Sequence, residues 1–251
     1  MKVNKDKILN LIFILLPFIC LFTIWQVGSL FTNEFILPSL FETLLATGKV
    51  LVSGKFYLSL LGTLLRTLIA FAISFLLAFF LAFWSRVSRR ADVTIAPVIS
   101  VFRALPTIAV VLLLLMWTNS FIAPIVVTSL VVLPTTYSAL RDAFFNVDGD
   151  LIRALKLFEV DQKTLLKKVY VPSVLPSTLL AIGSGLSLNL KLMVAAEVIA
   201  ATANSLGFML NSSKALFETA KMIAIVLITV VIGLIVELTF KSISKKVGVW
   251  Q

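Results

Sequence analysis

The sequence predicts an all-α integral membrane protein with six transmembrane helices and both termini in the cytoplasm. Of its 251 residues, 60% are hydrophobic and only 14% are charged, whereas a soluble domain is about half apolar and a quarter charged. The apolar residues fall in uncharged runs of 26, 37 and 22 residues, namely 8–33, 104–140 and 169–190. A helix needs about 20 apolar residues to cross a bilayer, so each run is long enough for at least one span.

The whole chain, residues 1–251, is expected to form one transmembrane domain. Its predicted spans are residues 8–30, 58–84, 93–117, 121–140, 174–199 and 217–240. The first is longer than the apolar core of a signal peptide and no small-x-small cleavage site follows it, so it is expected to stay in the protein. Pro97 and Pro106 interrupt the third span, which makes 93–105 a candidate for a separate short helix at the inner face.

Basic residues predict the orientation. If the N-terminus is cytoplasmic, the inner segments carry fifteen of the 22 lysines and arginines, and the outer segments carry only Lys49, Lys55 and Lys214. Positive charge concentrates on the cytoplasmic side of membrane proteins, so this asymmetry predicts cytoplasmic termini. It also explains the net charge of +10 without a nucleic-acid partner, which would need a basic patch on a soluble surface.

Composition excludes several kinds of site. Histidine is absent, which removes Ser-His and Cys-His catalysis, histidine-ligated haem and most zinc sites. A single cysteine, Cys20, cannot form an internal disulfide or a thiolate cluster. Neither catalytic residues nor a metal site are therefore predicted. The chain also has no GxxxxGK[ST] phosphate loop, so it is not expected to bind ATP in that way.

Small residues mark where helices are expected to pack. Ala70, Ser74, Ala78 and Ala82 recur at every fourth position of the second span, which predicts a groove for a neighbouring helix. A second small-residue set at 181–187 in the fifth span has the same packing interpretation. It is also a candidate pathway lining, because Asn189 and Lys191 follow it.

Two segments outside the spans have helical patterns. Ser39 and Glu42 fit a capping box, which predicts an amphipathic helix on the outer face, with a plain connecting loop as the alternative. In the long inner loop, 141–172, the apolar residues Leu151, Ala154, Leu155 and Phe158 share one face of a short helix. Asp161 is expected to cap a second short helix, which Pro172 and Pro176 would end.

This inner loop resembles that of ABC importer permeases of the nitrate, sulfonate and taurine type. The family's loop reads Glu-Ala-Ala, three residues, Gly, nine residues, Ile-x-Leu-Pro. The spacing to the proline, here Pro172, is kept, and the preceding run Asp150-Leu151-Ile152 is similar. The family's glutamate falls on Arg153, its alanines on Ala154 and Leu155, and its glycine on Glu159.

Other segments are similar to the same family in the right order, over about residues 35–245. They are Leu37-Pro38-Ser39, Phe102-Arg103-Ala104-Leu105-Pro106-Thr107-Ile108-Ala109 with Trp117, Val194-Ala195-Ala196-Glu197, and Leu206-Gly207.

The resemblance implies a type I ABC importer permease in the bacterial cytoplasmic (inner) membrane. Two permease chains, identical or different, would form the pathway, and an extracytoplasmic solute-binding protein would deliver the solute. Two cytoplasmic ATPase subunits would bind ATP and Mg²⁺, so this chain would hold no cofactor. The coupling loop to the ATPase would include Leu151, Arg153, Ala154, Leu155, Phe158, Glu159 and Pro172.

Polar residues inside the spans are the candidates for the pathway. An intramembrane charge costs about 2.5–3.5 kcal/mol on insertion scales, so it is interpreted as functional. Arg103 either lines the pathway or makes an inner-face contact, Lys191 either lines it or pairs with another subunit, and Glu197 is also interpreted as a structural partner. The pathway candidates are Arg103, Ser187, Asn189, Lys191 and Glu197. The resemblance implies a solute such as nitrate, bicarbonate, an alkyl sulfonate, taurine or a vitamin precursor. The two basic residues in the spans favour an anion among these.

The alternative is an ion-coupled secondary transporter. Such proteins usually show inverted repeats with paired broken helices, and no repeat relates the two halves of this chain. An intramembrane hydrolase is disfavoured, because Gly183-Ser184-Gly185-Leu186-Ser187 lacks the GxSxG order and the chain has no histidine base. A membrane scaffold without transport activity is the remaining option.

Overall fold

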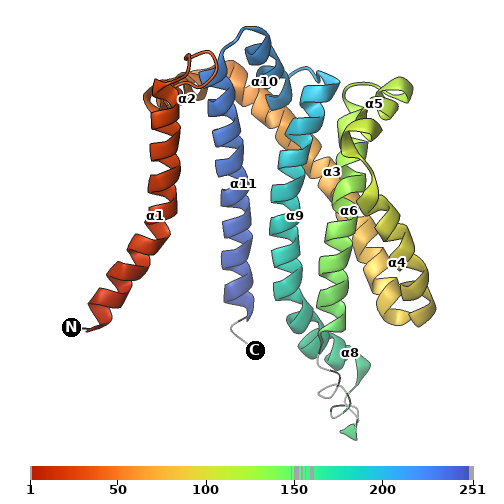
Figure 1. The fold of residues 1–251 in the computed structure, drawn as a ribbon. Coiled ribbons are helices and arrows are strands. Elements are labelled where there is room, and N and C mark those ends of the chain that lie inside the picture. Colours follow the sequence, from red (N-terminus) through yellow and green to blue (C-terminus); the bar gives the residue numbers. More distant parts are fainter. Residues whose placement is uncertain are drawn as a thin grey trace. The chain divides into compact units, whose positions relative to one another are not determined.

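The computed structural model describes residues 2–147, 149, 153, 155, 157, 158 and 161–248. All regular secondary structure in this part of the chain is helical (Figure 1). The chain divides into two compact units. One comprises Met1–Tyr57 with Met209–Ile228, and the other comprises Leu58–Phe208 with Thr229–Gln251.

The first unit contains α1 (Lys2–Leu30), α2 (Leu40–Val52) and the segment that leads into α11 (Thr219–Val247). The indole N–H of Trp25 in α1 donates to the carbonyl oxygen of Pro38 at 3.0 Å. The side-chain oxygen of Gln26 accepts from the backbone N–H of Leu40 at 3.2 Å. These two bonds hold the end of α1 against the start of α2, and the hydroxyl of Thr219 donates to the carbonyl oxygen of Phe35 in the same unit.

Helix α2 confirms the predicted helix between the first two spans, in place of a plain loop. Glu42 N–H donates to the Ser39 hydroxyl oxygen at 3.2 Å, and Ser39 N–H donates to the Glu42 carboxylate at 2.7 Å, so the capping box is complete. The Ser39 backbone N–H, helped by its hydroxyl, lowers the pKa of the Glu42 carboxyl below its ordinary value. Leu44, Leu45 and Leu51 are exposed, which is the arrangement expected of an amphipathic helix at a membrane surface.

The second unit is built around α3 (Gly54–Val87), α6 (Ile122–Phe145) and α9 (Val171–Ala200). Helices α6 and α9 run side by side and make the most extensive helix pair (Figure 1). The predicted groove on α3 is confirmed, because all four of its small residues are fully buried. Ala70 packs with Ile125 of α6 and Met193 of α9. The close approach of the three helices therefore depends on small side chains along α3.

The predicted third span is two helices, α4 (Arg89–Ala104) and α5 (Thr107–Trp117), whose axes are bent by 88°. The break falls at Leu105 and Pro106, because proline disfavours the helical conformation of the residue before it. The separate short helix expected at 93–105 is thus confirmed, but it begins earlier. Ser88 caps it by accepting from the N–H of Ala91 at 3.4 Å.

Among the described residues, four helices are long and apolar enough to cross a membrane: Gly54–Val87, Ile122–Phe145, Lys163–Ala200 and Thr219–Val247. The bent pair α4 and α5 makes a fifth if it is counted as one span, and Leu15–Leu30 of α1 is a shorter apolar stretch. These helices contain the predicted spans 58–84 and 174–199, and they contain the spans 121–140 and 217–240 except for the first residue of one and the first two residues of the other. Each of them has the length and the apolar composition that a membrane span needs.

The end of the inner loop differs from the prediction. Asp161 does cap α8 (Gln162–Leu165), since its carboxylate accepts from Thr164 N–H at 3.1 Å, and hydrogen bonds from Thr164 lower the pKa of Asp161. The helix is not ended by Pro172 and Pro176, however. It continues through a π-helical turn, Leu166–Tyr170, into α9. Pro172 lies in the first turn of α9, where a missing N–H is tolerated, and the π turn absorbs the change of register.

Candidate functional site

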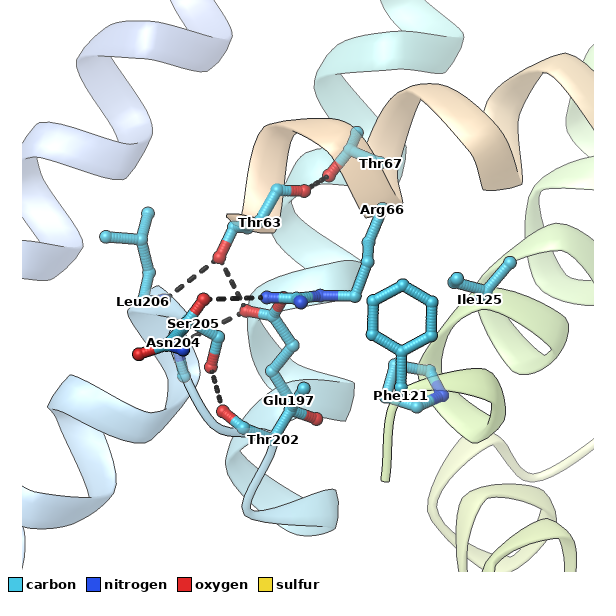
Figure 2. A network of polar contacts seen from close by, with 12 residues as sticks. Thr63, Arg66, Thr67, Phe121, Ile125, Glu197, Thr202, Asn204, Ser205 and Leu206 are labelled. Carbon is cyan, nitrogen blue, oxygen red and sulfur yellow. Dashed lines mark hydrogen bonds and ion pairs between the residues drawn. The ribbon is translucent and has the colours of Figure 1, made fainter. Parts of the chain in front are cut away.

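A buried ion pair joins α3 to the end of α9. Arg66 Nε lies 2.7 Å from Glu197 Oε1, and the side chains are only 4% and 0% exposed. Figure 2 shows Arg66 reaching from α3 toward the carboxylate, with the Phe121 ring beside it. Because each charge has left water, the pair is stable only if its remaining hydrogen-bonding capacity is also satisfied.

Three further hydrogen bonds satisfy the remaining donors and acceptors of this ion pair. The Thr63 hydroxyl donates to Glu197 Oε2 at 2.8 Å, and Gly207 N–H donates to the same oxygen at 3.3 Å. Arg66 Nη2 donates to the carbonyl oxygen of Asn204 at 3.1 Å (Figure 2). Gly207 belongs to the first turn of α10 (Leu206–Ala215), where free N–H groups and the helix dipole favour a carboxylate. The ionised carboxylate is therefore well compensated.

The turn between α9 and α10 has the backbone shape that this network needs. Ala201 and Asn204 both have left-handed conformations, with φ of 48° each. Gly207 allows the start of α10 to touch α9, since a Cβ atom there would lie 2.4 Å from the Cβ of Glu197. The hydroxyl of Thr202 donates to the carbonyl oxygen of Ser120 at 2.6 Å, which ties the turn to the α5–α6 connection as well.

The structure separates the predicted pathway residues into groups. Glu197 is enclosed in the ion-pair network. Asn189 faces α3, where its side-chain N–H donates to the carbonyl oxygen of Thr67 at 2.8 Å. Ser187 and Lys191 lie beside Gly233 of α11, since a Cβ at Gly233 would be 3.1 Å from the Ser187 hydroxyl and 3.8 Å from Lys191 Cε. Only Ser187 and Lys191 thus lie side by side.

Lys191 is exposed in the middle of α9, and within the described part of the chain its ammonium group has no hydrogen bond or ion pair. Arg103, at the end of α4, is different. Its Nη2 donates to the hydroxyl of Ser138 in α6 at 2.8 Å, although its side chain is exposed. An uncompensated ammonium inside a span needs either water, a ligand or a second subunit.

Four buried polar atoms have no hydrogen-bond partner among the described residues: Ser74 Oγ, Thr136 Oγ1, Ser187 Oγ and Asn189 Oδ1. All four lie in α3, α6 and α9. Two of them belong to predicted pathway residues, Ser187 and Asn189. Buried polar atoms are usually satisfied, so these atoms are acceptors or donors available to water or to a solute.

A cavity of about 620 Å³ in the first unit contains none of the predicted pathway residues. It lies between α2 and the start of α11. Its lining mixes both signs of charge: Glu34, Glu42, Lys49, Lys55, Glu218 and Lys221.

The residues of the coupling loop are described only in part. Leu151, Ala154 and Glu159 lie outside the described residues. Arg153 and Phe158 are exposed, Leu155 is half-buried, and Pro172 is exposed at the start of α9. Phe158 and its neighbour Leu157 are 80% and 84% exposed. Leu157 was not part of the predicted apolar face.

Arg66 is the site residue that the sequence reasoning did not assign. The available signal was a charged side chain one turn after Thr63 in an otherwise apolar segment, since intramembrane charges usually have a partner. The partner, Glu197, is 131 residues away, so spacing along the chain does not reveal it.

Replacing one member of the ion pair should destabilise the protein more than replacing both. Arg66→Met leaves Glu197 buried without its cation, and breaking a buried pair costs about 3–5 kcal/mol. In detergent, Arg66→Met and Glu197→Met should each lower the melting temperature, and the double substitution should recover part of the loss. Arg89→Met, at an exposed position, is the control with little effect. A double variant as unstable as the sum of the single variants would contradict this interpretation.

Comparison with known proteins gives the family. Residues 74–249 match the family described as "Binding-protein-dependent transport system inner membrane component". A putative aliphatic sulfonates transport permease protein of Bacillus subtilis (strain 168) is 23% identical over 241 residues, which cover 95% of this chain and 87% of that protein. A taurine transport system permease protein of Escherichia coli (strain K12) is 28% identical over 157 residues, or 62% of this chain and 56% of that one.

Two solved structures have a similar fold. One is the methionine ABC transporter MetNI in inward-facing conformations, with a TM-score of 0.64, 18% identity, and coverage of 75% of this chain and 94% of that chain. The other is an amino acid ABC transporter with histidines, with a TM-score of 0.58, 20% identity, and coverage of 76% and 92%. With the family match over residues 74–249, these findings show that the chain belongs to the binding-protein-dependent transport system inner membrane components, as a non-enzymatic permease subunit of an ABC importer.

Proposed function

We propose that this permease forms the pathway for a small anionic solute and that Lys191 contacts the solute during transport. The observation that carries the proposal is the exposed ammonium group of Lys191, which has no partner within the described part of the chain. Lys191 is nine residues from the end of α9, or about 14 Å at 1.5 Å per residue, so it lies deep within a bilayer core of about 30 Å.

The names of the relatives agree with this proposal. Aliphatic sulfonates and taurine, after which the two permeases are named, carry a sulfonate group. The Ser187 hydroxyl, one helical turn from Lys191 and without a partner in the described structure, offers a second polar contact on the same side of α9. An ammonium and a hydroxyl together suit an oxyanion, because charge-assisted hydrogen bonds are stronger than neutral ones.

We also propose six spans with both termini in the cytoplasm of a bacterium, α1 and the bent α4–α5 pair each counting as one span. Two permease chains, two ATPase subunits that bind ATP and Mg²⁺, and an extracytoplasmic solute-binding protein would complete the importer. The loop between α6 and α9 is the proposed contact with the ATPase. Phe158 and Leu157 support this role, because strongly exposed apolar side chains in a polar loop suit a partner's groove.

Removing the positive charge at residue 191 should weaken transport of an anionic solute. A charge-assisted hydrogen bond contributes about 1.5–3 kcal/mol, so Lys191→Leu should reduce apparent affinity for taurine or an alkyl sulfonate by about 10- to 100-fold. Lys191→Arg keeps the positive charge and should retain part of the wild-type affinity. The measurement is uptake of radiolabelled solute into cells with equal amounts of the complex. The matched control is Lys214→Leu, which changes an exposed lysine outside the spans. Wild-type uptake by both Lys191→Leu and Arg103→Leu would refute the proposal.

A carboxylate on the coupling loop should release the ATPase. Burying a Phe side chain contributes about 1.5–3 kcal/mol, and an aspartate entering an apolar groove would lose its hydration without a partner. Phe158→Asp and Leu155→Asp should therefore abolish transport. The complex would be captured through a tag on this chain and the recovered ATPase quantified, with Lys163→Ala as the control. Wild-type recovery of the ATPase with intact transport would show that the loop is not the contact.

Cysteine labelling tests the topology. In a Cys20→Ser background, cysteines at Val87 and Lys167 should react with an impermeant thiol reagent only from the cytoplasmic side, and one at Leu216 only from outside. All three positions are exposed, so a lack of reaction from one side reports the membrane and not burial. Labelling of Val87→Cys from the outside would contradict the six-span arrangement.

A further inference from the structure

The inner end of α6 is held by a bidentate ion pair whose two residues are not among the proposed pathway residues. Arg141 of α6 donates from Nε to Asp92 Oδ1 at 2.6 Å and from Nη2 to Asp92 Oδ2 at 2.7 Å. Asp92 lies in the first turn of α4. Two parallel bonds fix the relative orientation of the two groups as well as their distance, and the side chains of Arg141 and Asp92 are only 34% and 21% exposed.

Helix α3 holds the same end of α6. Arg86 Nε donates to the carbonyl oxygen of Phe144 at 3.1 Å, in the last turn of α6 where carbonyls lack helical partners and the dipole favours a cation. The Phe145 ring has guanidinium groups near it, with Arg141 Cζ 4.4 Å and Arg86 Cζ 5.6 Å from its centroid. Phe79 of α3 also packs edge-on against Phe144, with ring centroids 5.6 Å apart.

These contacts stand directly before the proposed coupling loop. Helix α6 ends at Phe145, and Val147, two residues later, is buried in a cluster with Ala143 of α6 and Val174 of α9. The base of the loop is therefore packed on both sides. A displacement of Val147 would therefore move Ala143 and, through helix α6, Arg141.

Helix α4 and helix α5 have different supports. Helix α4 is joined to α6 through Asp92–Arg141 and through Arg103–Ser138. Val111 of α5 is buried with Val127 of α6 and Ala196 of α9. The 88° bend between α4 and α5 falls at Leu105–Pro106, where the helical hydrogen bonds are interrupted. Helix α4 also packs against α3 and α6 through Ala91, Ile95 and Ile99, so the two halves of this span have separate contacts with the rest of the unit.

We infer that Arg141, acting through Asp92, is a positioning residue that transmits movement of the coupling loop to α4. We call Arg86, Asp92, Arg141 and Phe145 the inner joint. When the ATPase moves the loop, the inner joint turns α4 with the end of α6, while the bend at Leu105–Pro106 leaves α5 packed against α6 and α9. This inference rests on the proposed role of the loop in contacting the ATPase.

The test follows the position of α4 in the intact complex. A Val93→Cys reporter, in a Cys20→Ser background, lies next to Asp92 at an exposed position. The complex is captured with its ATPase and reconstituted in lipid nanodiscs. The rate of thiol labelling is then compared without nucleotide and with MgATP and vanadate. Coupling free energies correspond to about 5- to 150-fold effects, so the two rates should differ at least about fivefold.

Breaking the inner joint should remove this nucleotide response without removing the ATPase. With Arg141→Leu or Asp92→Asn, the two labelling rates should become equal within about twofold, below the usual range of coupling effects, while ATPase recovery and ATP hydrolysis stay near wild type. The matched controls are Arg90→Leu and Asp142→Asn, which change the same charges at exposed positions nearby and should keep the full response.

Arg141→Lys is the conservative variant. It keeps the charge but loses the bidentate geometry, so an intermediate response is expected even if Arg141→Leu fails to assemble. A wild-type response in Arg141→Lys and Asp92→Asn would overturn the inference, and so would equal labelling rates in the unmodified joint. If the wild-type chain captures no ATPase, the proposed function of the loop fails, and the inner joint fails with it.

Discussion

The buried pair of Arg66 and Glu197 is the constraint on which one end of the second unit depends. Two charges with almost no exposure are tolerated only when their partners are held in place. Without such partners, nothing offsets the free energy that each charge loses when it leaves water. The partners come from α3, the α9–α10 turn and the first turn of α10. The left-handed residues of that turn and the missing side chain of Gly207 follow from the need to bring these groups together.

The rest of the unit is held mainly by close helix packing. Small residues along α3 let α6 and α9 approach, which matters in a bilayer because lipid offers no hydrophobic drive between helices. Polar contacts appear at the two ends of this packed region, around Arg66 at one end and around Arg141 at the other. These contacts tie α3 to α9 at one end and α4 to α6 at the other.

Compensated and uncompensated charges have different meanings in this protein. Arg66 and Glu197 neutralise each other, so their role in the described structure is to hold helices. Lys191 has no such partner in the described residues, and in the proposed function it is the solute that neutralises its charge. This contrast explains why Glu197 and Lys191, six residues apart on the same helix, do not belong to one site. The family assignment also replaces the secondary-transporter alternative, because these permeases belong to ABC importers.

The sequence alone predicts every feature that depends on composition or on residues close together in the chain. These features are the membrane class, the spans within α3, α6, α9 and α11, the capping box of α2 and the break at Pro106. Local patterns were insufficient at Pro172, where a π turn carries the helix onward, and at Ser88, which starts α4 before the predicted residue. Only the tertiary structure decided which charges are paired. Glu197 pairs with Arg66, which is 131 residues away in the chain, and Asp92 pairs with Arg141, which is 49 residues away. Both pairings depend on how whole helices pack, so local sequence patterns do not reveal them.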